Sequence, residues 1–168
     1  ISRSLRKVLR KQQFEIRFDT AFQQVIKACA DVRTEQGEGT WIIPEMQQAY
    51  TELHQDGFAH SVESWQDGKL AGGLYGISLG QCFFGESMFS TRNDSSKVAL
   101  AALAEFCREV GIKMIDCQMT TAHLLSLGAK EIRREVFLKK LKKHLEQPTL
   151  KGSWNSGSAS VKSNIFQN

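Results

Sequence analysis

The sequence lacks any apolar run long enough to cross a membrane, and it has no signal-like apolar segment. It also lacks a Cys-x-x-Cys pair, and none of His54, His60 and His144 stands at ligand spacing from a cysteine. Its four cysteines are widely spaced: Cys29, Cys82, Cys107 and Cys117. These absences argue against a membrane span, a disulfide framework and a metal site. They predict reduced thiols and a cytoplasmic location.

The hydrophobic and charged contents are ordinary, but the positive charges are unevenly distributed along the chain. The chain has 168 residues, 41% of them hydrophobic and 24% charged, with a net charge of +4. One chain of this length can bury one well-filled core. Because it starts with Ile1 rather than Met, it is expected to be a fragment or a processed form. Cations crowd both ends: Arg3, Arg6, Lys7, Arg10, Lys11 and Arg17 at the start, and Lys139, Lys140, Lys142, Lys143 and Lys151 near the end. Such flanks suit a polyanion held at the periphery, although two solvated helix faces would look the same.

Hydrophobic periodicity predicts an α+β (α/β sandwich) fold with a mixed sheet. Asp19 is the predicted N-cap of the second helix, and Asp67-Gly68 the tight turn of an antiparallel meander. The predicted helices span residues 2–12, 20–33, 44–57, 96–110, 123–127 and 134–147. The predicted strands span residues 13–18, 59–66, 69–78, 81–89 and 112–119. The tail from Gly152 is rich in Ser, Asn and Gly, which predicts disorder.

The main candidate site follows from residues 81–119, which form a predicted strand–helix–strand unit. Such units place their two strands parallel, and ligands tend to bind beyond the carboxyl ends of such strands. Glu86 lies in an apolar stretch beside Gly85, and period two puts Asp116 and Gln118 on one face of the second strand. Phe83, Met88, Leu100 and Leu103 would supply an apolar wall. Three polar groups in an apolar pocket suit a small-ligand site. The alternative is that Glu86 faces solvent, Asp116 pairs with a lysine and Gln118 caps a helix.

Two further features bear on the ligand. The loop before the predicted helix 96–110 contains no glycine, so it cannot be a Gly-rich phosphate cradle, although the helix N-terminus could still receive one phosphate. Trp41 follows two glycines and could stack on a nucleobase, although an isolated tryptophan more often belongs to a core.

The order of several motifs identifies a resemblance over about residues 2 to 141. They are Gly39-Thr40-Trp41-Ile42, Phe58-Ala59-His60-Ser61-Val62-Glu63, Gly72-Gly73-Leu74-Tyr75-Gly76, Gly85-Glu86-Ser87-Met88-Phe89-Ser90, Ile115-Asp116-Cys117-Gln118 and Ser126-Leu127-Gly128-Ala129. The sequence resembles the leucyl/phenylalanyl-tRNA–protein transferase family.

The resemblance implies an acyl-CoA N-acyltransferase-like fold that uses aminoacyl-tRNA in place of coenzyme A, with no cofactor. It implies transfer of Leu or Phe, and less well Met, from the tRNA 3′ end to bacterial proteins with N-terminal Arg or Lys, marking them for degradation. It also assigns residues. The implied catalytic residues are Asp116, Gln118 and Glu86. The implied amino-acid pocket is Leu74, Phe83, Met88, Leu100, Leu103 and Ile115. Trp41 would hold the terminal adenosine, and Ser2 to Lys11, with Arg3, Arg6, Lys7, Arg10 and Lys11, would bind tRNA.

On this basis residues 1–40 form a basic N-terminal segment, residues 41–147 the acyltransferase-like catalytic domain, and residues 148–168 a disordered tail. Members of the family carry a further N-terminal segment before the point at which this chain begins. Two alternatives stay open: a coenzyme A-dependent N-acyltransferase of the same fold, and a non-catalytic tRNA-binding module.

Overall fold

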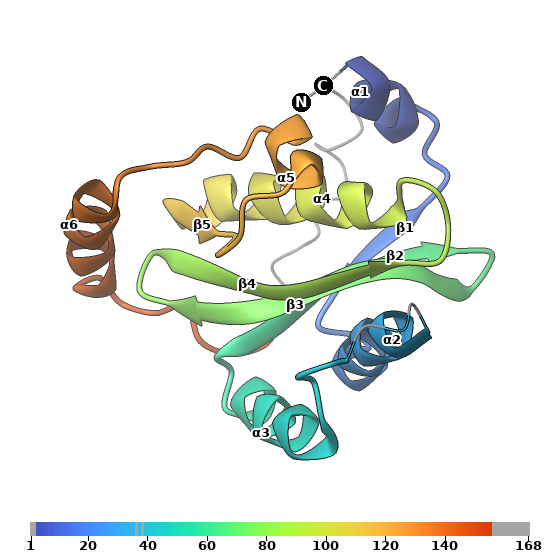
Figure 1. Ribbon diagram of the computed structural model, residues 1–168, viewed down its shortest axis with the longest axis horizontal. Helices are drawn as coiled ribbons and strands as arrows, with labels where there is room; N and C mark the ends of the chain where they lie inside the picture. The colour runs from blue at the N-terminus through green and yellow to red at the C-terminus, as the bar shows by residue number, and fades with distance from the viewer. Residues whose placement is uncertain (1–2, 36, 38, 156–168) are drawn as a thin grey trace.

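A five-stranded mixed sheet lies at the centre of the protein (Figure 1). The computed structural model describes residues 3–35, 37 and 39–155. The strands follow one another across the sheet in chain order: β1 (Glu15–Phe18), β2 (Ala59–Gln66), β3 (Lys69–Leu79), β4 (Cys82–Ser90) and β5 (Met114–Asp116). The first four strands are antiparallel, and β5 runs parallel to β4. The predicted mixed sheet, with a meander followed by a parallel pair, is confirmed.

Helices cover both faces of the sheet (Figure 1). They are α1 (Arg3–Arg10), α2 (Phe22–Glu35), α3 (Pro44–Gln55), α4 (Ser95–Val110), α5 (Ala122–Ser126) and α6 (Arg134–Leu145). Leu74 and Tyr75 are neighbours in β3 and point to opposite faces. Leu74 belongs to the cluster under α4 and α1, whereas Tyr75 belongs to the cluster under α2 and α3. No helix in the described ranges combines the length and apolarity that a membrane span requires.

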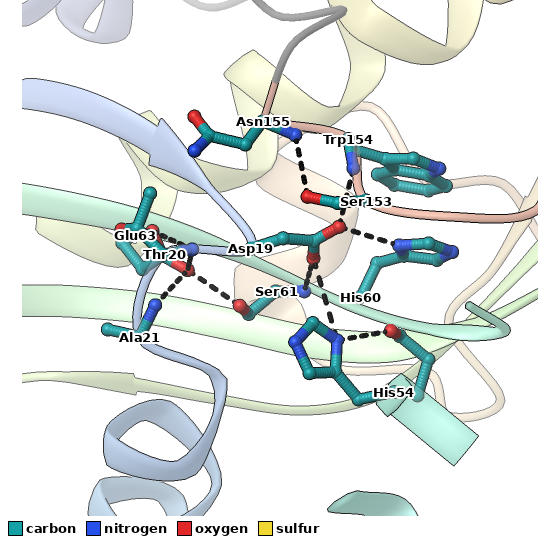
Figure 2. Close-up of polar contacts among 11 residues, drawn as sticks. Asp19, Thr20, Ala21, His54, His60, Ser61, Glu63, Ser153, Trp154 and Asn155 are labelled. Carbon is teal, nitrogen blue, oxygen red and sulfur yellow. Dashed lines mark hydrogen bonds and ion pairs between the residues drawn. The ribbon is translucent and has the colours of Figure 1, made fainter. Parts of the chain in front are cut away.

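Two buried carboxylates, Asp19 and Glu63, lie close to the chain that leads into α2 (Figure 2). The prediction that Asp19 caps α2 is wrong: its carboxylate accepts hydrogen bonds from His60 Nδ1 at 2.9 Å, Ser61 N at 2.9 Å and Trp154 N at 2.7 Å. Glu63, buried in β2, accepts instead from Thr20 Oγ1 at 2.6 Å and from the Thr20 and Ala21 amides at 3.3–3.4 Å. A long-range contact therefore anchors the chain that leads into α2.

The end of the described chain packs on the fold, which corrects the predicted tail for residues 148–155. Gly152 N donates to Gly57 O at 3.2 Å, and Gly80 N donates to Thr149 Oγ1 at 2.8 Å. Trp154 is only 2% exposed. One large apolar ring and its amide outweigh the local Ser, Asn and Gly composition, because burial of an aromatic ring contributes a few kcal/mol. The remainder of that prediction lies outside the described residues.

Candidate active site

The candidate site lies where β4 and β5 separate. Their parallel pairing ends with Phe84 opposite Asp116, after which β5 stops while β4 continues to Ser90. At the same level β4 contains a bulge, since Tyr75 pairs with Ser87 and Gly76 with Gly85, leaving Glu86 without an opposite residue. Bulges re-aim side chains beside active sites in many sheets. Here the bulge takes Glu86 out of the simple alternation that the sequence predicted.

Glu86 has a partner that sequence reasoning missed. The Tyr50 hydroxyl of α3 lies near the Glu86 side chain. Burial and the nearby Glu86 charge raise the pKa of Tyr50 far above its usual range, so the hydroxyl keeps its proton beside the carboxylate. Trp41 meets the Tyr50 ring edge-on, with centroids 6.2 Å apart, and is 42% exposed. The structure thus brings Glu86 and Trp41 into one neighbourhood through Tyr50, whose sequence signal indicated only an inward-facing helix position.

Asp116 and Gln118 lie together, but the predicted strand geometry is wrong. The predicted strand 112–119 is only Met114–Asp116, and Gln118 has a left-handed φ of 61°. The Gln118 N–H folds back and donates to Asp116 Oδ1 at 2.8 Å. Such side-chain-to-backbone turns are typical of aspartate. The backbone of Gln118, rather than its amide side chain on a strand face, therefore orients the carboxylate.

A groove of about 980 Å³ opens beside Asp116. Its walls come from Leu100 and Ala104 of α4, residues 114–121, α5, and residues 127–137, which lead into α6. Much of the outer wall is apolar and exposed: Met119 is 70% exposed, Leu125 48% and Ile132 46%. Apolar walls with a few carboxylate and basic groups are the composition of a ligand site. The sequence predicted an apolar wall from Phe83, Met88, Leu100 and Leu103. Residues 117–121 and 127–132 supply a further wall of the groove that the sequence did not predict.

The six residues expected to line the amino-acid pocket form one hydrophobic cluster, but few of them reach the groove. Leu74, Phe83 and Leu103 are buried in that cluster, with 4%, 0% and 1% of their surfaces exposed. Met88, Leu100 and Ile115 are partly buried and pack against it. Of the six, Leu100 and Ile115 line the groove.

The expected tRNA contacts lie on α1. Arg6, Lys7, Arg10 and Lys11 are exposed, while Leu5 and Leu9 bury the other side of the helix in the cluster under α4. The side chain of Arg3, and Ser2 altogether, lie outside the described residues. In the part of the chain that the structure describes, no three His, Cys, Asp or Glu side chains gather as a metal-ligand set.

Comparison with known proteins identifies the family. A family model described as leucyl/phenylalanyl-tRNA protein transferase matches residues 1–142. The chain belongs to this family. It is 59% identical to the leucyl/phenylalanyl-tRNA–protein transferase of Desulfatibacillum aliphaticivorans over 155 residues, covering 92% of this chain and 66% of that protein. It is 58% identical to the enzyme of that name from Aromatoleum aromaticum, covering 99% of this chain and 70% of that protein. The chain thus spans about two thirds of these family members, and the resemblance drawn from its motifs is confirmed.

Solved structures show the fold that the family chain shares. An aminoglycoside acetyltransferase from an uncultured soil metagenomic sample, in complex with sisomicin, aligns with a TM-score of 0.56 at 17% identity, covering 73% of this chain and 93% of that one. The aminoglycoside N-acetyltransferase AAC(6')-Iy aligns with a TM-score of 0.53 at 15% identity, covering 72% and 90% of the two chains. The predicted acyl-CoA N-acyltransferase-like fold is therefore confirmed.

Proposed function

We propose that this chain carries the centre that transfers leucine or phenylalanine, and less well methionine, from aminoacyl-tRNA to proteins with N-terminal Arg or Lys. The product is a new peptide bond and, in the cytoplasm, a degradation signal. The observation that carries the proposal is the family match over residues 1–142 together with Asp116 on the wall of a groove. Because the chain spans about two thirds of its relatives, the activity of the whole protein is part of the proposal.

The reaction requires an amine and an ester to meet and a proton to move. The α-amine attacks the ester carbonyl, a C–N bond forms, the bond to the tRNA ribose oxygen breaks, and that oxygen takes a proton. The ester is already activated, so positioning and proton transfer are the tasks left for the protein. Asp116 suits proton transfer, since Gln118 N donates to its Oδ1 and leaves Oδ2 to accept a proton from the amine. The tRNA's own ribose hydroxyl is the alternative proton carrier.

Glu86 suits recognition of the acceptor protein. It is a half-buried carboxylate near Tyr50, next to the strand pair that ends at Asp116. Two carboxylates at one edge favour a cationic N-terminal residue over a neutral or acidic one. Trp41, edge-on to Tyr50 and exposed, offers an aromatic surface for the terminal adenosine.

The start of α4 is poorly suited to the phosphates of coenzyme A. Ser95 is fully buried, and its hydroxyl donates to Ala71 O at 2.8 Å, so the first turn is packed against β3. Asp94 precedes that turn with a left-handed φ of 67°, and its carboxylate pairs with Lys97 at 2.6 Å. A carboxylate beside a helix N-terminus repels a phosphate that would bind there. This favours the aminoacyl-tRNA proposal over a coenzyme A-dependent enzyme.

The decisive experiment follows radiolabelled leucine from Leu-tRNA to a test protein with N-terminal Arg. We expect transfer by the wild type, a loss of about 100-fold or more in Asp116→Asn, and full activity in Asp67→Asn. The control suits the structure because Asp67 is exposed in the β2–β3 turn, where Asn is equally compatible with its φ of 51°. Transfer unaffected by Asp116→Asn would contradict the assigned role. Binding of tRNA without transfer would indicate a binding module, and binding of acetyl-CoA without tRNA binding would indicate the acyl-CoA alternative.

The role of Gln118 needs a variant that keeps its backbone. Because the backbone N–H makes the contact, Gln118→Gly should retain the orientation of Asp116 and accept the left-handed φ without strain. We expect the pH–rate profile of Gln118→Gly to match that of the wild type. A shifted profile would show that the amide side chain takes part directly.

The amino-acid pocket can be tested with a pair of tryptophan variants. Leu103 is buried, so Leu103→Trp would overpack the core at a cost of about 1–3 kcal/mol and report on packing. Leu100 is only partly buried and lines the groove, so Leu100→Trp should fill the groove and reduce Phe transfer more than stability. Normal Phe transfer by Leu100→Trp would place the pocket elsewhere.

A further inference from the structure

Helix α6 carries a row of lysines that its packing does not explain. Lys139, Lys142 and Lys143 stand at i, i+3 and i+4 and are all exposed, so they share one side of the helix. The side that faces the protein is formed by Phe137, Leu141 and other partly buried residues, and none of the helix is fully buried. The lysines are therefore not needed to hold α6 in place.

Helix stability accounts for only some of these charges. Lys142 and Lys143 lie in the last turn, where the helix dipole favours positive charge. Lys139 follows Glu135, the one acid in the helix, by four residues, but it also repels Lys143 at i, i+4. Among the described residues, none of the three lysines forms an ion pair. At the other end, Arg133 and Arg134 stand at the N-terminus, where positive charge opposes the helix dipole. Helix stability therefore does not explain why α6 carries positive charge at both of its ends.

The helix is fixed directly beside the groove. Arg134 and Phe137 belong to the groove wall, together with Lys130 from the preceding segment. The far end is tied to the β3–β4 turn, since Gln81 N donates to His144 O at 3.0 Å. Figure 1 shows α6 and α1 toward opposite ends of the long axis, with α4 and β5 between them. Lys139, Lys142 and Lys143 thus lie on the outer side of a helix whose first turns form part of the groove wall.

We propose that α6, through Lys139, Lys142 and Lys143, binds the phosphate backbone of the tRNA acceptor arm as its 3′ end enters the groove. The inference rests on the proposed function, because it assumes that the groove receives an aminoacyl end. Lysines bind phosphates as point charges without reading sequence, which suits a surface that must accept tRNAs for more than one amino acid. Complementary charge, on a helix whose first turns line the groove, favours RNA as the occupant.

The test compares two triple variants with the same change in net charge. Lys139→Gln/Lys142→Gln/Lys143→Gln keeps helix propensity while removing the proposed contacts. The control, Lys27→Gln/Lys69→Gln/Arg108→Gln, removes three cations from other surfaces, two of which are paired with Asp31 and Glu105. Binding of uncharged tRNA is measured over a range of salt concentrations. We expect the α6 variant to bind about tenfold more weakly at moderate salt. Its log–log salt slope should fall by roughly 3, because each of the three lost phosphate contacts lowers that slope by about 1.

Transfer kinetics supply a second readout. The α6 variant should raise the KM for Leu-tRNA and leave kcat nearly unchanged, whereas a leucyl-adenosine donor, which lacks the acceptor arm, should react as with the wild type. Affinity and salt slope equal to those of the control variant would overturn the proposal, as would an equal loss with both donors. Retained tRNA binding with lost binding to anionic phospholipid vesicles would also overturn it, in favour of a membrane contact. If the wild type transfers no leucine, the proposed function fails while the salt titration still decides the role of α6.

Discussion

Trp154 should carry a large share of the stability, although it lies in a stretch that reads as a tail. Its ring stacks on His60 with centroids 3.7 Å apart and planes 6° apart, and it meets Phe106 at 4.6 Å and Phe83 at 5.8 Å. Replacing a fully buried tryptophan by alanine typically costs about 3–5 kcal/mol, through lost transfer free energy and a residual cavity. We therefore expect Trp154→Ala to lower the free energy of unfolding by about 3–5 kcal/mol.

Trp154→Phe is the matched control. Among the described residues the buried indole N–H of Trp154 has no hydrogen-bond partner, which offsets part of the gain from burying the ring. Phenylalanine removes that donor and keeps most of the apolar ring, so we expect a loss below about 2 kcal/mol. The hydrogen bond from the backbone N–H of residue 154 to Asp19 is retained in both variants, because it does not involve the side chain. Comparison of the two isolates the ring from the backbone contact.

Urea denaturation followed by circular dichroism measures both changes. A chain ending at Ser153 should lose more stability than Trp154→Ala, because the buried Asp19 carboxylate also loses one of its three donors; a chain ending at Asn155 is the reference. A loss below about 1 kcal/mol in Trp154→Ala would refute the reasoning, since it would mean that the ring contributes no more than an exposed residue.

Three shorter predictions follow. A Cβ on Gly76 would overlap Phe84 O, whereas a Cβ on the opposite residue, Gly85, would have its nearest atom at 3.5 Å. Gly76→Ala should therefore lower Tm by roughly 5–10 °C, and Gly85→Ala by less than about 2 °C. Burial raises the pKa of Glu63 above 4.5, so its contribution to stability is present below pH 4.5 and is lost as the pH rises. The wild type should therefore exceed Glu63→Gln in free energy of unfolding by more at pH 4.5 than at pH 7.5. The reverse order would contradict this. N-ethylmaleimide should modify Cys117, in the groove wall, before the three buried thiols and block leucine transfer, while Cys117→Ser resists inactivation; mass spectrometry identifies the modified residue.

Elements whose signals are local were predictable from the sequence. The Asp67-Gly68 turn has positive φ at both residues, as the dipeptide predicts, and α4 ends at Gly111 with a left-handed φ of 87°. Hydrophobic periodicity gave the order of helices and strands for the same reason. Contacts between distant segments were not predictable. Nothing near Asp19 in the sequence shows that its carboxylate accepts hydrogen bonds from His60 and Trp154, or that Glu63 accepts the hydrogen bond from Thr20 before α2.

The same division explains the candidate site. A lone carboxylate in an apolar stretch pointed to Glu86, because a charge in such surroundings needs a partner or a ligand. The partner, Tyr50, comes from another helix, and the bulge depends on how β3 pairs with β4. Likewise, alternation could bring Asp116 and Gln118 near each other but assumed that the strand continues. The strand ends at Asp116, and the left-handed φ of Gln118 departs from a continuing strand. The bulge in β4 thus leaves Glu86 without an opposite residue, and a sequence pattern built on regular strands cannot represent it.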